Sequence, residues 1–198
     1  MSLPTKLTVS RIVLAVIVMF ILIFPLYLIG IEFPRFVIGG VYIKSEYIIA
    51  GVLFIAASIT DALDGKIARK RNLVSDLGKM LDAIADKILV DSVLIILACQ
   101  GFISVVIPVV IIVRDIVVDA LKMEVASHGK VVAAIMSGKI KTAFLMVGIA
   151  LSLFYNMPFE LINIDLANFC LYVAAIMSIV SMVQYMIMTK NVLEKDKK

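Results

Sequence analysis

The sequence has few charged side chains for its length. Asp, Glu, Lys and Arg together make up 17% of the 198 residues, whereas soluble domains contain about 25%. Hydrophobic residues reach 63%, and the mean hydropathy is +1.11. This composition excludes an ordinary soluble domain and is typical of an integral membrane protein.

Cysteine and histidine are nearly absent. Two cysteines, Cys99 and Cys170, are too few for a disulfide framework and lack zinc-binding spacing, so we expect small buried side chains. We expect the one histidine, His128, to be solvated in a loop. The chain also lacks repeats, low-complexity segments and a cleavage site typical of signal peptides. We therefore expect a single membrane domain over residues 1–198.

Long uncharged runs predict the membrane-spanning helices. Such runs cover Ile12–Ile31, Ser92–Val113, Thr142–Phe159 and Leu166–Thr189. A spanning helix needs about 20 mostly apolar residues, and Gln100-Gly101 divides the second run as a turn. The shorter uncharged stretch Tyr47–Thr60 must continue through Asp61 to about Ala68 to cross. The sequence thus predicts an all-α integral membrane protein with six transmembrane helices, over about residues 7–30, 46–69, 78–99, 102–125, 138–157 and 165–189.

Basic residues determine the predicted orientation. Most of them fall at the two termini and in the even-numbered connections, whereas the odd-numbered connections contain only Arg35 and Lys44. Because basic loops stay in the cytoplasm, we expect both termini to be cytoplasmic. This asymmetry accounts for the net charge of +4, so no nucleic-acid partner is expected.

Two pairs of aspartates lie between apolar segments, in ITDALDGKIARKRNLVSDLGKMLDAIADKI (residues 59–88). Asp61 and Asp64 are three residues apart, and Asp82 and Asp86 are four apart, so each pair shares one helix face. Four facing carboxylates cannot all stay ionised without positive charge among them. We expect two divalent cations, and oxygen ligands favour Mg²⁺, Mn²⁺ or Ca²⁺ over zinc.

Small residues and an arginine accompany these pairs. Gly65, Ala68 and Gly78 allow a ligand or another backbone to approach closely. Arg69 lies one turn beyond Asp64, where its guanidinium can hold a phosphate. Salt bridging to neighbouring lysines and arginines is an alternative for any single aspartate. For the whole set it fails, because basic residues in a cytoplasmic loop need no partner.

The eight fixed positions Asp61-x2-Asp64-Gly65-x2-Ala68-Arg69-x8-Gly78-x3-Asp82-x3-Asp86 match the signature of the CDP-alcohol phosphotransferase family over 26 residues. The six predicted spans agree with that family. The opening LPTKLTVSR resembles the PNxxTxxR start of bacterial members, with Thr5 in place of the usual Asn.

The resemblance implies a metal-dependent transfer from a CDP-linked lipid, CDP-diacylglycerol, within a membrane homodimer. Asp61, Asp64 and Asp82 would hold two Mg²⁺ or Mn²⁺ ions, and Asp86 would contact metal and act as the general base. The site that binds CDP would comprise Asp61, Gly65, Ala68, Arg69 and Gly78.

The acceptor is indicated by basic residues in the second half. Arg114, Lys122, Lys139 and Lys141 fall near the cytoplasmic aspartates and suit a phosphorylated alcohol. The segments RDIVVDALK (114–122) and SGKIKTA (137–143) resemble those of bacterial phosphatidylglycerophosphate synthases. This resemblance implies sn-glycerol 3-phosphate as acceptor and phosphatidylglycerol phosphate as product.

Three alternatives stay open from the sequence. The same chemistry with another acceptor, such as inositol phosphate, serine or a lipid, is the nearest. A divalent-cation transporter would also keep acids in its spans, but here the acids lie near one face and form no path across. The third alternative is a scaffold whose acids bind a partner.

Overall fold

The computed structural model describes residues 3–30, 33–71, 76–130 and 132–194, and the side chains at 3–8, 29, 61–71, 76–83 and 193–194 lie outside the description. The elements are, in order, α1 (Leu3–Ile23), η1 (Leu26–Ile29), β1 (Arg35–Ile38), β2 (Val41–Lys44), α2 (Ser45–Arg71), α3 (Asp76–Cys99), α4 (Val106–Ser127), α5 (Met136–Leu153), η2 (Phe159–Ile162) and α6 (Leu166–Glu194).

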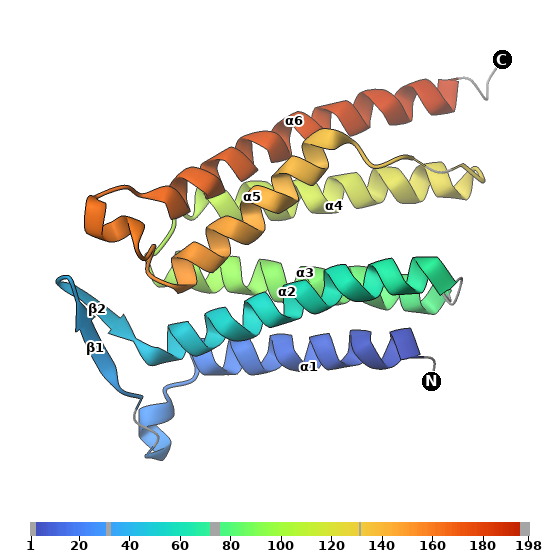
Figure 1. Cartoon of the computed structure of the whole chain (residues 1–198). Helices are drawn as coiled ribbons and strands as arrows, with labels where there is room; N and C mark the ends of the chain where they lie inside the picture. Colours follow the sequence, from blue (N-terminus) through green and yellow to red (C-terminus); the bar gives the residue numbers. More distant parts are fainter. Residues whose placement is uncertain (1–2, 31–32, 72–75, 131, 195–198) are drawn as a thin grey trace.

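Six α-helices run through the described residues along one common direction (Figure 1). Both chain ends lie at one end of the bundle, which we call the terminal end, and β1, β2 and η2 lie at the other, the hairpin end. α1 packs against α2 and α3, whereas α6 packs against α4 and α5. Contacts of α2 with α5, and of α3 with α4 and α5, join the two groups.

The helices agree with the six predicted segments except at some ends. α1 ends at Ile23 rather than near residue 30. Pro25 follows, and its ring and missing N–H oppose a continuing helix, while the residue before it avoids helical backbone angles. α5 ends at Leu153 rather than near residue 157, because Tyr155 and Asn156 take positive φ angles of 56° and 55°.

The all-α prediction omits a short antiparallel hairpin at residues 35–44. β1 and β2 are four residues each, and Arg35 pairs with Lys44 at the open end of the hairpin. Gly39 and Gly40 form the turn with φ angles of 59° and 87°, which other residues rarely adopt. A Gly-Gly dipeptide between β-branched and aromatic residues is the sequence signal for such a turn.

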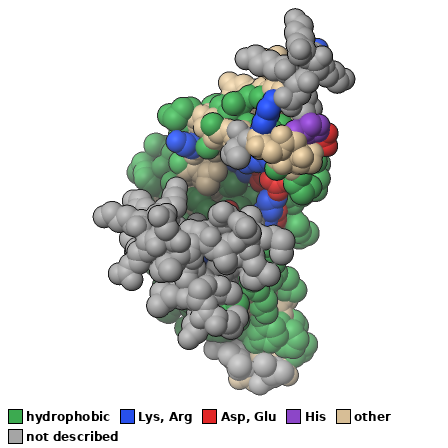
Figure 2. Space-filling view, turned by 90° about the vertical axis from the view of Figure 1, so that its right-hand side faces the viewer, with side chains coloured by type: hydrophobic (Ala, Val, Ile, Leu, Met, Phe, Trp, Pro, Cys, Tyr) green, Lys and Arg blue, Asp and Glu red, His purple; other side chains and the backbone are tan. Residues whose placement is uncertain are grey.

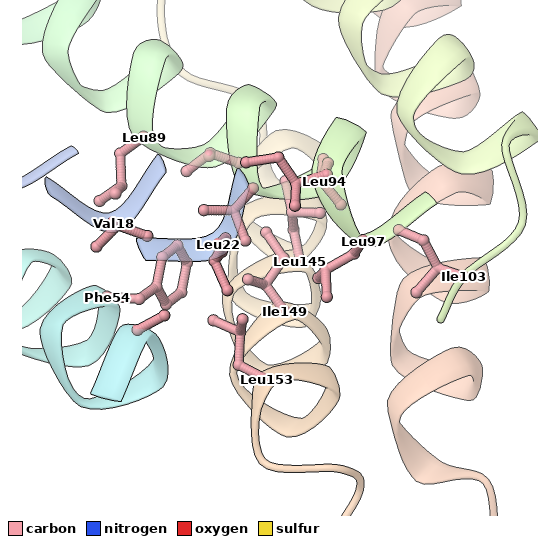
Figure 3. Packing of buried hydrophobic residues seen from close by; sticks show 14 of the residues in the cluster. Val18, Leu22, Phe54, Leu89, Leu94, Leu97, Ile103, Leu145, Ile149 and Leu153 are labelled. Atoms are coloured by element: carbon pink, nitrogen blue, oxygen red, sulfur yellow. The ribbon is translucent and has the colours of Figure 1, made fainter. Parts of the chain in front are cut away.

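Apolar side chains from all six α-helices meet inside the bundle, and Figure 3 shows part of this cluster. Leu145, Ile149 and Leu153 are spaced by four along α5 and point to one side, as the helical period requires. They meet Phe54 of α2 and Leu97 of α3. This contact region holds the two groups of helices together.

Large apolar side chains also cover the outside. On α6, Ile176, Ile179, Val183 and Ile187 are all exposed. Among the described helices, α5 and the Leu166–Val192 part of α6 are long and apolar enough to cross a membrane, and Val9–Ile23 and Ser45–Thr60 are shorter apolar stretches. An apolar exterior and an apolar interior together favour a lipid environment.

Close packing of α5 on α6 depends on Gly148. A Cβ atom at this position would lie 2.6 Å from Leu171 Cγ and 3.2 Å from the Leu171 backbone N. Small residues at helix contacts allow such close approach in membrane proteins.

We expect Gly148→Ala to lower the free energy of unfolding by about 1–3 kcal/mol, because the added methyl group overpacks this contact. Thermal unfolding in detergent, followed by circular dichroism, measures the change. Val147→Ile also adds one carbon, at a half-exposed neighbour, and should leave Tm unchanged. An unchanged Tm for Gly148→Ala would contradict the proposed packing constraint.

Candidate active site

The four motif aspartates belong to two helix ends that lie at the terminal end of the bundle (Figure 1). Asp61 and Asp64 fall in the second half of α2, and Asp82 and Asp86 fall in the first half of α3. The helical backbone therefore keeps each pair on one face. The structure describes the side chain of Asp86, which is half-buried.

The other predicted donor-site residues have side chains outside the description, namely Asp61, Asp64, Gly65, Ala68, Arg69, Gly78 and Asp82. Among the described side chains, no group of three or more His, Cys, Asp or Glu residues is placed to hold a metal ion. A metal site at this end would therefore need the motif aspartates at 61, 64 and 82. Carboxylates supply the hard oxygen ligands that Mg²⁺ and Mn²⁺ prefer, so this donor set fits such ions.

Three of the four predicted acceptor residues line one cavity. Arg114 and Lys122 come from α4, Lys139 and Thr142 come from α5, and Tyr185 comes from α6; together they form the polar lining of a cavity of about 540 Å³. The structure thus brings Lys139 beside Arg114 and Lys122, which precede it by 25 and 17 residues. The helix period explains Arg114 and Lys122, since eight residues return to nearly the same face.

Arg114 is almost completely buried and held by other side chains. Its Nε and Nη2 donate to Ser181 Oγ at 3.0 and 2.7 Å, and its Nη1 donates to Asp115 Oδ1 at 2.7 Å. Ser181 in turn donates to the Ser178 carbonyl at 2.9 Å. A guanidinium carries five N–H groups, so two remain outside these three bonds while the side chain lines the cavity.

Lys141 is buried on the other side of Asp115. Its Nζ donates to both carboxylate oxygens of Asp115, at 3.0 and 2.7 Å, and Lys141 is not one of the residues lining the cavity. Asp115 therefore joins two buried cations, which fits the rule that charges inside a protein are paired. The predicted role of Lys141 as a direct phosphate ligand stays a prediction.

Tyr185 lies beside both cavity cations. Its ring centroid is 5.6 Å from Arg114 Cζ and 5.1 Å from Lys122 Nζ, distances at which a cation is attracted to the ring. The Tyr185 hydroxyl accepts a hydrogen bond from the Ile135 backbone N–H at 3.3 Å. The ring thus links α6 to both the α4 cations and the start of α5.

Sequence reasoning missed Ser181 and Tyr185. A signal was present, because Ser178, Ser181 and Tyr185 are spaced by three and four within a long apolar run, which places them on one face of α6. Another polar contact of this face is the bond from Ser137 Oγ to Gln184 Oε1 at 2.6 Å. Polar residues at helical spacing in a membrane helix indicate a contact with a neighbouring helix.

The terminal end carries charges of both signs outside this cavity as well. Figure 2, which views this end, shows Lys and Arg side chains close to Asp and Glu side chains on the part that is described. One such pair joins Lys87 of α3 to Asp119 of α4, and both side chains are more than one-third exposed. Arg114 and Lys141 differ from this pair, because both are buried beside Asp115, whereas Lys122 and Lys139 are exposed.

A family model described as CDP-alcohol phosphatidyltransferase matches residues 1–189. The protein named CDP-diacylglycerol–glycerol-3-phosphate 3-phosphatidyltransferase from Bacillus subtilis is 40% identical over 184 residues, covering 93% of each chain. A protein of the same name from Rickettsia bellii is 33% identical, and the match covers 93% of each chain. Another from Haemophilus influenzae is 32% identical, and the match covers 96% of this chain and 94% of that protein.

The fold is also similar to that of a solved structure. The crystal structure of apo phosphatidylinositol phosphate synthase from Mycobacterium tuberculosis aligns with a TM-score of 0.60 at 17% identity, covering 92% of this chain and 86% of the other. At that identity the likeness concerns the fold alone.

We expect Asp115→Asn to lower the free energy of unfolding by about 3 kcal/mol, because it leaves Arg114 and Lys141 buried without a carboxylate. Thermal unfolding of the purified protein in detergent tests this.

Asp119→Asn, one turn further along α4, is the matched control. It breaks the more exposed pair with Lys87 and should cost less than about 1 kcal/mol. Equal effects of the two variants would contradict the interpretation of Asp115 as the buried counter-ion.

Proposed function

The chain belongs to the CDP-alcohol phosphatidyltransferase family, and from this premise we propose that it makes phosphatidylglycerol phosphate. The phosphatidyl group of CDP-diacylglycerol is transferred to sn-glycerol 3-phosphate, and CMP is released. The observation that carries this proposal is the identity of 32–40% over more than nine-tenths of the chain to enzymes named for that reaction. The resemblance found in the sequence motif is thereby confirmed at the level of the family.

The donor binds, in this proposal, between α2 and α3 at the terminal end. Asp61, Asp64, Asp82 and Asp86 would hold two divalent cations, Mg²⁺ or Mn²⁺. When bound, such ions neutralise the donor diphosphate and the charge that develops on it. Gly65, Ala68 and Gly78 leave room for the CDP group, and Arg69 holds a phosphate.

Asp86 is the proposed general base. Its carboxylate takes the proton from the acceptor hydroxyl, and the hydroxyl oxygen attacks the β-phosphorus of the donor. The bond between that phosphorus and the oxygen of CMP breaks, and CMP leaves with the electron pair. Asp86 is half-buried on α3, so part of its side chain stays accessible to an acceptor hydroxyl at this end of the bundle.

The acceptor phosphate binds, in this proposal, in the cavity of Arg114, Lys122 and Lys139. Arg114 offers two further N–H groups from a position held by Ser181 and Asp115. Lys141 acts mainly by neutralising Asp115, so that this carboxylate does not repel the phosphate. Serine brings one carboxylate together with an ammonium group that these cations repel, whereas a phosphorylated alcohol brings a phosphate and no positive charge.

We infer that all six helices cross the membrane and that both termini are cytoplasmic. Support comes from the apolar exterior, from the position of both termini at one end and from the basic residues concentrated at that end. The active site then faces the cytoplasm, where glycerol 3-phosphate is available. We also infer a homodimer, as the family resemblance implies.

CMP release by the purified, detergent-solubilised protein tests the proposal. CDP-diacylglycerol is supplied with Mg²⁺ or Mn²⁺, and glycerol 3-phosphate, inositol phosphate, inositol and serine are offered separately. We expect release only with glycerol 3-phosphate, its loss with EDTA, and its loss in Asp86→Asn without unfolding.

Each other result has a definite meaning. Release with a different acceptor would keep the donor site and reject the acceptor assignment. Full activity of Asp86→Asn would remove Asp86 from the mechanism. No release with any acceptor would return attention to the transporter and the scaffold, which the family assignment disfavours.

Lys139→Ala should raise the KM for glycerol 3-phosphate by about tenfold and leave the KM for the donor unchanged. A bond between charged groups contributes about 1.5 kcal/mol or more, which corresponds to this factor. Lys130→Ala is the control, because the Lys130 ammonium donates to the Val192 carbonyl and is not among the residues lining the cavity. A raised donor KM with an unchanged acceptor KM would contradict the assignment.

A further inference from the structure

A second cavity of about 520 Å³ lies at the hairpin end, far from the aspartates. Its polar lining comes from the hairpin, the start of α2 and the end of α3, and its apolar lining comes from the end of α1 and from η1. The proposed reaction uses none of these residues.

Two of the residues that line this cavity carry a positive charge and lie opposite each other in the hairpin. Arg35 and Lys44 are direct cross-strand partners in the hairpin, and both are exposed. Like charges directly opposite each other destabilise a strand pair. Within the part of the chain that the structure describes, neither side chain forms an ion pair with an acid. A bound anion would remove this repulsion.

Hydrogen bonds join the cavity-lining residues of α1 and α2 to Gln100, which directly follows α3. The buried Tyr47 donates its hydroxyl hydrogen to Gln100 Oε1, and Gln100 Nε2 donates to the Leu22 carbonyl at 3.0 Å. Lys44 Nζ lies 6.0 Å from the Tyr47 ring centroid. Glu46 also lines the cavity and can accept a hydrogen bond from an N–H or O–H group next to the anion.

The surroundings of the cations are apolar. Ile21, Ile23 and Phe24 line the cavity, and Tyr27 and Leu28 beside them are about two-thirds exposed. Beyond the cations the hairpin exposes its own apolar side chains, Phe36, Val37, Ile38 and Tyr42. An exposed apolar patch of this kind marks a membrane or ligand contact.

We propose that Arg35 and Lys44 bind the phosphate of a phospholipid headgroup on the side of the membrane opposite the active site. The headgroup rests over Tyr47 and Gln100, Glu46 accepts a donor group of the headgroup, and the acyl chains lie along the apolar end of α1 and η1. The hairpin then lies in the membrane interface, where apolar side chains and cations are both stabilised. The placement across the membrane rests on the topology in the proposed function.

Phosphatidylethanolamine is the probe, because it carries an ammonium next to its phosphate and is neither the proposed donor nor the product. Delipidated full-length protein in detergent is titrated with it, and native mass spectrometry counts the lipids bound per chain. We expect one bound lipid in the wild type and at least tenfold weaker binding in Arg35→Gln/Lys44→Gln. Lys195→Gln/Lys197→Gln removes the same charge near the C-terminus and should bind like the wild type.

Equal binding by both double variants would overturn the site. Glycerophosphoethanolamine, the same headgroup without acyl chains, is offered as a competitor, and competition at equal concentration would reject the lipid in favour of a soluble phosphate. If the double variant unfolds, the single variants Arg35→Gln and Lys44→Gln are used instead, after circular dichroism has shown that they fold. Each should then bind the lipid more weakly than the wild type, and unchanged binding by both would overturn the site.

Two further measurements separate this inference from the proposed function. CMP release by Arg35→Gln/Lys44→Gln should stay close to that of the wild type, and absent release in every variant would reject the reaction without affecting the lipid result. Among the large apolar side chains of the hairpin, Tyr42 is the most exposed, at 76%. A membrane-impermeant maleimide should label Tyr42→Cys in intact cells above the wild-type level, and absent labelling would overturn the placement on the outer side.

Discussion

A charged side chain between apolar helices needs an opposite charge or a polar partner within reach, and this constraint determines how the terminal halves of α4, α5 and α6 are arranged. Arg114 cannot be solvated where it lies, so Ser181 approaches it from α6 and Asp115 lies beside it on α4. Asp115 in turn brings in Lys141 from α5. One carboxylate therefore joins two helices, and one hydroxyl joins the third.

The lipid environment also explains why the apolar helices pack so closely elsewhere. Helices in lipid gain little from burying apolar surface, so their contacts depend on shape and on small residues. Gly148 meets Leu171 across the α5–α6 contact, and the fully buried Ala174 lies on α6 one turn beyond Leu171. With these contacts made, the polar network near the terminal end has a defined separation between α4, α5 and α6.

Sequence patterns predict where the helices lie in the chain, but not which side chains the helices bring into contact. The predicted spans agree with α2 and α3 to within two residues at each end, because the length of a spanning helix follows from the thickness of the bilayer. α6 continues to Glu194, five residues beyond its predicted end. The first helix is predicted too long, since an apolar run does not reveal that Pro25 ends it. The hairpin was not predicted, because each of its strands has only four residues and so gives a much weaker sequence pattern than a helix. For the basic residues, position in the chain and the family resemblance indicate Arg114, Lys122, Lys139 and Lys141. Neither tells which lysine contacts Asp115 and which lines the cavity.

Charge of opposite sign on the two parts of the proposed active site orients the acceptor. The motif aspartates on α2 and α3 form the negative part, which two divalent cations would neutralise. The cavity on α4 and α5 is the positive part, because Asp115 offsets only one of the cations gathered there. In the proposed site, a molecule with a phosphate at one end and a hydroxyl at the other would be held with its phosphate toward Arg114 and Lys139. Its hydroxyl would then be directed to the aspartate side, where Asp86 is proposed to accept the proton, so the separation of charge would select the end of the acceptor that reacts.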